Sequence, residues 1–125
     1  YLHCEKGNSF VAGEMYCPDP INLKKIRKEI EFFHEDLEEI LTKKIFITQY
    51  KELTVEETNK LKKAPKDFDA NHPAIELLKF KSFTASQKLN DNDFFEKDFA
   101  QKIAQKMIVL QPLNDFLRRA LETIE

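Results

Sequence analysis

The fold of this chain is set by its opening stretch, YLHCEKGNSFVAGEMYC at residues 1–17. Apolar and polar residues alternate on both sides of Gly7-Asn8, which is a common tight-turn dipeptide, so the stretch predicts a β-hairpin in which Cys4 lies opposite Val11. The face expected to turn toward the core carries Leu2, Cys4, Val11, Gly13, Met15 and Cys17. A hairpin alone is only marginally stable in water, so we expect these strands to belong to a larger sheet.

The residues that follow the hairpin predict helices. Asp19 is a good N-cap, and Pro20 suits the first helical position because its missing N–H is not needed there. Apolar residues recur at helical spacing as far as Phe33, and a second helix is expected from Glu35 with a break near Thr42.

The middle of the chain is less regular. Residues 52–70 are predicted to form a surface loop, in which residues 54–57 are either a capping box or the end of a strand. A further helix is expected to begin at His72-Pro73, capped by His72 or Asn71, and residues 80–89 alternate as an extended segment does. A turn at residues 90–93 then precedes an amphipathic helical run that Pro112 should kink or restart.

These patterns predict a single α+β domain that is predominantly helical. An antiparallel hairpin at residues 1–17 packs against about five helices within residues 19–125.

Composition excludes several classes of partner. The chain has 125 residues, of which 20 are basic and 22 acidic, and its net charge of −2 predicts no nucleic-acid partner. No apolar run approaches the ~20 residues of a membrane span, so no membrane partner is expected either. With only two glycines and no metal or nucleotide signature, no cofactor or metal ion is predicted.

Cys4 and Cys17 do not face each other in the predicted register, so no disulfide is expected between them. Two free thiols indicate a cytoplasmic protein.

Three blocks of the sequence, in the same order, resemble a bacterial family known only as domain of unknown function 2461. They are FVAGEMYCPDP at residues 10–20, PKDFDANHPAIELLKFKSF at residues 65–83 and LQPLNDFL at residues 110–117. The resemblance implies no activity, because none is established for the family. Its members carry an additional N-terminal half, so the resemblance implies that this chain is the C-terminal portion of a longer protein.

The first candidate site lies on the polar face of the hairpin. His3 and Glu5 are two residues apart on one strand, and Glu14 lies on the next strand. An imidazole with carboxylates can bind a metal or move a proton, but an ordinary polar sheet face explains the same residues and is favoured. The family pattern also usually has glycine where Glu14 stands, which counts against Glu14.

The second candidate site is the segment around His72. The start of the helix, together with Lys79 or Lys81, would hold a phosphate or carboxylate group. The alternative, again favoured, is that His72 only caps the helix. Arg27 lies in the helix after the hairpin and is a further candidate anion-binding group.

We therefore expect a domain that binds a small ligand or a protein partner through the polar sheet face and the His72 loop, with His3, Glu5, Arg27, His72, Lys79 and Lys81 as candidate binding residues. The first alternative is an enzyme whose active site needs the absent N-terminal half and uses His3, Arg27, His72 and Lys79. The second is a structural role, including a homodimer formed through an exposed sheet edge. Convergence of the candidate residues on one cleft would favour the enzyme.

Overall fold

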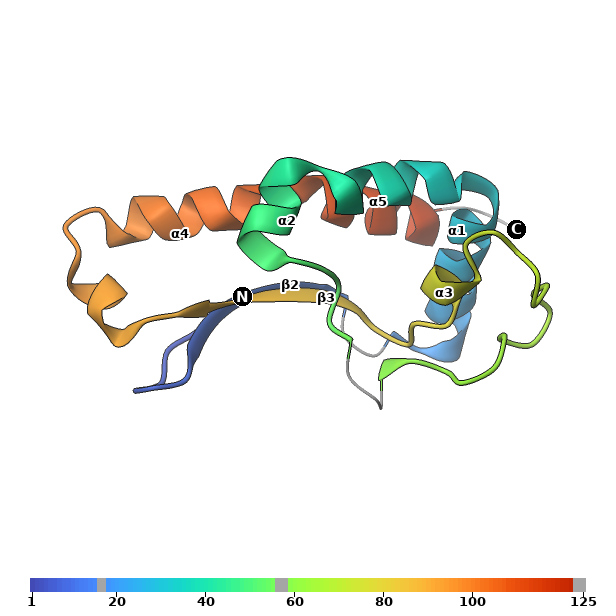
Figure 1. Cartoon of the computed structure of the whole chain (residues 1–125), viewed down its shortest axis with the longest axis horizontal. Helices are drawn as coiled ribbons and strands as arrows, with labels where there is room; N and C mark the ends of the chain where they lie inside the picture. Colours follow the sequence, from blue (N-terminus) through green and yellow to red (C-terminus); the bar gives the residue numbers. More distant parts are fainter. Residues whose placement is uncertain (16–17, 56–58, 123–125) are drawn as a thin grey trace.

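The computed structural model describes residues 1–15, 18–55 and 59–122, and for Glu14 and Met15 it describes the backbone only. The chain forms three strands, five α-helices and a short 3-10 helix within these residues (Figure 1). In chain order they are β1 (Leu2–His3), β2 (Ser9–Met15), α1 (Pro20–Thr42), α2 (Lys44–Tyr50), α3 (Ile75–Leu78), β3 (Phe83–Leu89), η2 (Asp91–Phe95), α4 (Phe99–Ile108) and α5 (Gln111–Glu122). The predicted α+β, predominantly helical class is confirmed.

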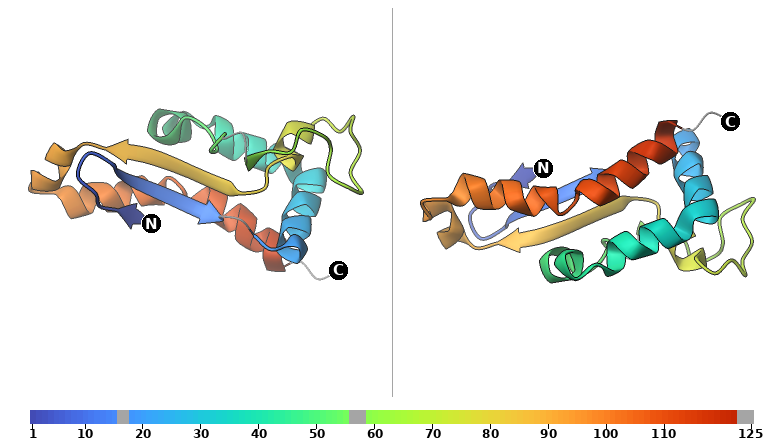
Figure 2. Two further views of the ribbon diagram at one scale, coloured as in Figure 1. Left: turned by 90° about the horizontal axis from the view of Figure 1, so that it is seen from below. Right: turned by 90° about the horizontal axis from the view of Figure 1, so that it is seen from above.

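The sheet is antiparallel in the order β1-β2-β3, so the hairpin does belong to a larger sheet. Its third strand, β3, is the extended segment expected at residues 80–89. In the described part of the chain, α2, α4 and α5 lie over one face of the sheet and no helix covers the other face (Figures 1 and 2). Val11, Phe83 and Ala85 point to the helical side and are fully buried, so this face forms the core.

The register predicted for the hairpin is wrong by two residues. Leu2 pairs with Val11 and His3 with Phe10, and the turn spans Glu5 to Asn8, whose N–H donates to the Glu5 carbonyl at 2.9 Å. Gly7 takes the third turn position with φ 78°, a left-handed conformation that glycine adopts at no steric cost. Because a strand alternates with period two, a shift of two residues keeps Val11 on its predicted core face, where it is buried. Cys4 was predicted on the same face, but it follows the end of β1 and is exposed.

Of the two cysteines, which were predicted not to form a disulfide, the structure describes only Cys4. Cys4 is free and exposed. Cys17 lies outside the described residues, as do residues 56 and 57 of the 54–57 segment for which two structures were predicted.

The predicted helix signals are largely confirmed. The Asp19 side chain accepts the Asn22 N–H at 2.8 Å and caps α1. The expected break near residue 34 is a kink at Phe33 (φ −128°, ψ 32°), and α1 ends at Thr42 as expected. Pro112 lies in the first turn of α5, so the last helical run restarts there.

One helix start is wrong. The helix expected at His72-Pro73 begins at Ile75, because residues 71–74 form turns before it. The resulting helix, α3, has only four residues.

The core side of β2 is closely packed at Gly13. A Cβ atom added there would lie 2.9 Å from Cδ1 of Leu110, whose side chain is 2% exposed. We expect Gly13→Val to lower the free energy of unfolding by about 1–3 kcal/mol, because the added methyl groups overpack this contact. Ala12→Val, on the open face one residue earlier, is the matched control and should change stability by less than about 0.5 kcal/mol. Urea unfolding of both variants measures the difference, and equal stability would contradict the packing described for β2.

Candidate functional site

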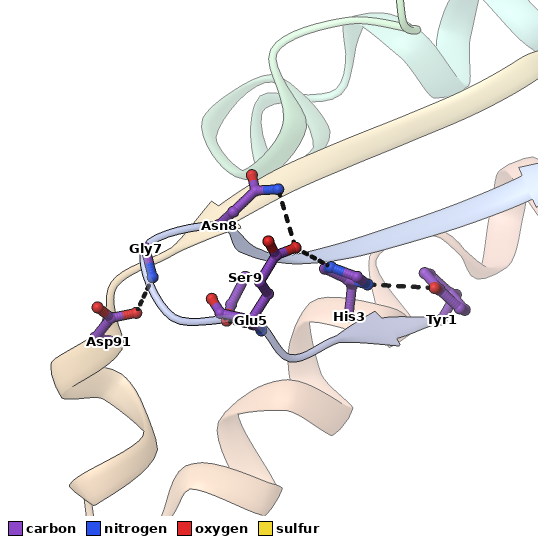
Figure 3. A network of polar contacts seen from close by, with 7 residues as sticks. All are labelled: Tyr1, His3, Glu5, Gly7, Asn8, Ser9 and Asp91. Carbon is purple, nitrogen blue, oxygen red and sulfur yellow. Dashed lines mark hydrogen bonds and ion pairs between the residues drawn. The ribbon is translucent and has the colours of Figure 1, made fainter.

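The first predicted pair, His3 and Glu5, is in contact at the end of the hairpin (Figure 3). Nε2 of His3 lies 2.9 Å from Oε2 of Glu5, and the Asn8 side-chain amide donates to the same oxygen at 3.4 Å. These hydrogen bonds, that from His3 first, lower the pKa of the Glu5 carboxyl below its ordinary value. The pair therefore carries a carboxylate at neutral pH, in a solvent-exposed position.

The surrounding hairpin is held by its own contacts (Figure 3). The Ser9 hydroxyl donates to the Glu5 carbonyl at 2.8 Å, and the Gly7 N–H donates to Oδ1 of Asp91 at 2.8 Å. The His3 ring stacks on Phe10, with 4.8 Å between the ring centroids. His3 and Glu5 thus belong to an ordered hairpin end.

A metal site on this face has no support among the described residues. No group of three or more His, Cys, Asp or Glu side chains in that part of the chain is placed to hold a metal ion. The observed register also pairs the backbone of Glu14 with Thr84 of β3 and places it beyond the end of β1. Glu14 therefore does not lie diagonally across from His3, as the predicted register had suggested.

His72 holds the kink of α1. Its Nδ1 accepts the Ala74 N–H at 2.9 Å, so Nε2 carries the proton and donates to the Glu31 carbonyl at 3.0 Å. Such a partner is needed where a kink interrupts the helical hydrogen-bond ladder, because the freed carbonyls would otherwise stay unpaired. The predicted capping role of His72 is thus partly right: it accepts an N–H just before α3 and also ties this loop to α1.

Arg27 has a structural role at the other side of α3. Its Nε donates to the Leu78 carbonyl at 2.8 Å, and its Nη2 donates to the Phe80 carbonyl at 3.1 Å. Burial lowers the pKa of the guanidinium from its ordinary value. Arg27 fastens the connection between α3 and β3 to α1, so these donors are not free for an anionic ligand.

The lysines of this region form a cluster that the sequence did not reveal as a unit. Residue 60 pairs with residue 80 in an isolated antiparallel bridge, the Leu61 N–H donates to the Lys79 carbonyl at 2.9 Å, and the Lys81 N–H donates to the Asn59 carbonyl at 2.8 Å. This pairing brings together two segments that are nearly twenty residues apart in the sequence. We use the name lysine cluster for the six lysines of the two paired segments and of the loop that follows the first: Lys60, Lys62, Lys63, Lys66, Lys79 and Lys81. Among them, Lys60 and Lys79 are shown to meet, because both contact Glu76.

Glu76 lies within the lysine cluster. Its two carboxylate oxygens contact the ammonium groups of Lys60 and Lys79, each at 2.9 Å. The hydrogen bond from Lys79, and then that from Lys60, lower the pKa of the Glu76 carboxyl to about 2. A carboxylate is already held between two lysines, as expected of an anion-binding surface.

The candidate residues do not converge on one cleft. His3 and Glu5 lie on the hairpin, whereas Arg27, His72, Lys79 and Lys81 lie around α3, toward the other end of the sheet (Figures 1 and 2). Of the second group, Arg27 and His72 bond to backbone, while Lys79 and Lys81 join the lysine cluster.

A groove of about 340 Å³ between α1 and α5 contains none of the predicted residues. Arg119 lines it, with Nε 2.7 Å from Oε2 of Glu29 and its guanidinium over the rings of Phe33 and Phe116. No sequence pattern marked this groove, because Glu29 and Arg119 are 90 residues apart in the sequence and meet only in the fold.

Comparison with known proteins identifies the family. The family model described as "Conserved hypothetical protein (DUF2461)" matches residues 1–116. The chain belongs to this family. No curated protein and no solved structure matches it.

Within the described residues, every helix is too short or too polar to cross a membrane.

The role of His72 can be tested by removing its side chain. We expect His72→Ala to lower the free energy of unfolding by about 1–3 kcal/mol, because the Glu31 carbonyl and the Ala74 N–H both lose a partner. His3→Ala on the exposed hairpin is the control and should cost less than about 0.5 kcal/mol. Chemical denaturation followed by circular dichroism compares the two, and an unchanged His72→Ala protein would show that the kink needs no such partner.

The ion pairs of Glu76 predict a pH dependence. The folded-state pKa of about 2 lies below the ordinary value of 4.5, so their contribution to stability is complete above pH 4.5 and is lost as the pH falls toward 2. A carboxyl titration by NMR should give the low value in the native chain. In a Lys60→Gln/Lys79→Gln variant the pKa should return toward 4.5. A pKa near 4.5 in the native chain would mean that the two lysines do not hold Glu76.

Proposed function

We propose that this chain is a binding domain for an anionic ligand or an anionic segment of a protein partner, with the lysine cluster as the contact surface. The observation that carries the proposal is Glu76, a carboxylate held between Lys60 and Lys79. The proposal keeps the ligand-binding function expected from the sequence and narrows the ligand to an anion. The contact surface that we propose is the lysine cluster, in place of the polar sheet face and the His72 loop expected from the sequence.

Local charge supports the proposal. Residues 59–81 contain six lysines and three carboxylates, whereas the whole chain has a net charge of −2. Exposed charges are screened beyond about 10 Å at moderate salt, so a partner at this surface responds to the local excess of lysines. Lys62, Lys63, Lys66 and Lys81 are exposed and accessible to a partner.

The rigidity of the surface beneath the cluster also supports binding. Asn59 donates from its side-chain amide to the carbonyls of Thr54 and Ser82, at 2.8 and 3.2 Å. Arg27 holds the paired segment through the Leu78 and Phe80 carbonyls. Lysines displayed on a fixed backbone lose less entropy on binding than lysines on a free loop.

The enzyme alternative has less support, because the residues proposed for it lie in two places and two of them bond to backbone. The cytoplasmic location and the homodimer through a sheet edge stay predictions. The first is consistent with the free Cys4 thiol, and the second with the position of β1 at the edge of the sheet.

Binding to heparin, a general polyanion, tests the proposal. We expect a Lys62→Gln/Lys63→Gln/Lys81→Gln variant to bind about tenfold more weakly, in line with the loss of three exposed charge pairs worth about 0.2–1 kcal/mol each. The control variant, Lys24→Gln/Lys44→Gln/Lys97→Gln, removes three exposed lysines elsewhere and has the same net charge. It should bind as the native chain does. Equal weakening in both variants, or no binding by the native chain, would contradict the proposal.

A further inference from the structure

In the contact between Glu76 and its two lysines, the glutamate side chain is much more exposed to solvent than the lysine side chains. The side chains of Lys60 and Lys79 are 26% and 20% exposed, whereas that of Glu76 is 65% exposed. The two lysine side chains are therefore the more buried part of the contact, and the Glu76 side chain is the more exposed part. A rotation of the Glu76 side chain to another rotamer would uncover both lysines without moving the backbone.

The two lysines are positioned by the backbone pairing beneath them. Lys60 lies opposite Phe80 in the isolated bridge, and its Nζ is 5.2 Å from the centroid of the Phe80 ring. Lys79 directly precedes Phe80 and follows the last residue of α3. The bridge thus fixes the backbone from which both lysines extend, and Glu76 is the group that both ammonium groups contact.

We propose that Lys60 and Lys79 bind the phosphate group of a phosphate monoester, and that Glu76 occupies this site as an internal competitor until the ligand displaces it. This inference rests on the proposed function and names the ligand class for the centre of the lysine cluster. Two oxygens of one phosphate would take the places of the two carboxylate oxygens. Lysine is a common phosphate-binding residue and acts as a point charge.

The charge of the ligand decides between phosphate monoesters and other anions. A ligand that displaces Glu76 must replace a carboxylate of charge −1 that already contacts both lysines. A carboxylate or a phosphodiester also carries −1, so the exchange gains little electrostatic energy. A phosphate monoester carries about −1.5 to −2 near pH 7, and it therefore competes successfully.

Methyl phosphate and dimethyl phosphate, a matched monoester and diester, test this inference. Native protein should bind methyl phosphate at pH 8, seen as ¹H–¹⁵N NMR shifts at Lys60, Lys79 and their neighbours, and should bind dimethyl phosphate more weakly. Lowering the pH to 5 should weaken methyl phosphate binding, because the second pKa of a phosphate monoester lies near 6.

Glu76→Gln provides the decisive variant. Removing the competing charge should tighten methyl phosphate binding by about two- to tenfold, the range expected for one or two exposed ion pairs. Lys60→Gln/Lys79→Gln should abolish binding at this position. Glu76→Gln also loses the two exposed ion pairs, so its thermal unfolding temperature, measured alongside, should fall slightly while the variant stays folded.

Three outcomes would overturn the inference: Glu76→Gln binds methyl phosphate no more tightly, the diester binds as well as the monoester, or the shifts lie away from Lys60 and Lys79. If heparin binding still depends on Lys62, Lys63 and Lys81, the proposed function survives this failure. If heparin binding fails as well, both proposals are wrong.

Discussion

The attachment of the α3–β3 connection to α1 is the interaction on which this structure depends most. Arg27 makes it, by donating to the carbonyls of Leu78 and Phe80 from the middle of a long helix. The Leu78 carbonyl is at the end of α3, where helical carbonyls lack intrahelical partners, so the guanidinium satisfies a group that would otherwise be orphaned. The same contact fixes the direction in which the chain enters β3, and with it the pairing of residue 80 with residue 60.

His72 makes the corresponding attachment at the entrance to α3. It joins the Glu31 carbonyl at the kink of α1 to the Ala74 N–H before α3. The segment between the two attachments, residues 72–80, is thereby held to α1 at both ends. Lys79 lies in this segment, and Lys60 is joined to it through the bridge between residues 60 and 80, so the loop region holds these two lysines on ordered backbone.

The sequence predicted those features that depend on near neighbours. The Asp19 cap, the restart at Pro112 and the break at Thr42 each follow from a few adjacent residues, and the structure confirms them. The predicted core face of the hairpin is confirmed at Val11 and is wrong at Cys4, which is exposed. The hairpin register was missed because Gly7-Asn8 fits a turn at either of two positions, and the choice depends on contacts such as that between Gly7 and Asp91. The start of α3 was missed because His72 bonds to α1, a residue range far away in the sequence.

The candidate site was predictable only in its parts. His3 with Glu5 was recognised from their spacing, which puts both on one face of a strand, and the structure brings them into contact. Lys79 and Lys81 were candidates without the lysines of residues 60–66, because no local pattern shows that residue 60 pairs with residue 80. Arg27 and His72 were candidates for the right reason, being polar groups beside a helix, but backbone carbonyls and an N–H already use their donors and acceptors.

Net charge describes a protein poorly when charges are segregated. The total of −2 predicts no nucleic-acid partner, yet residues 59–81 have twice as many lysines as carboxylates. The compensating acidic residues lie elsewhere, including Asp36, Glu39 and Asp115 along the groove between α1 and α5. A ligand small compared with the separation of these regions interacts with one of them and is screened from the other. Glu76 illustrates this at one point, where hydrogen bonds from Lys79 and Lys60 lower the pKa of its carboxyl although the chain as a whole is acidic.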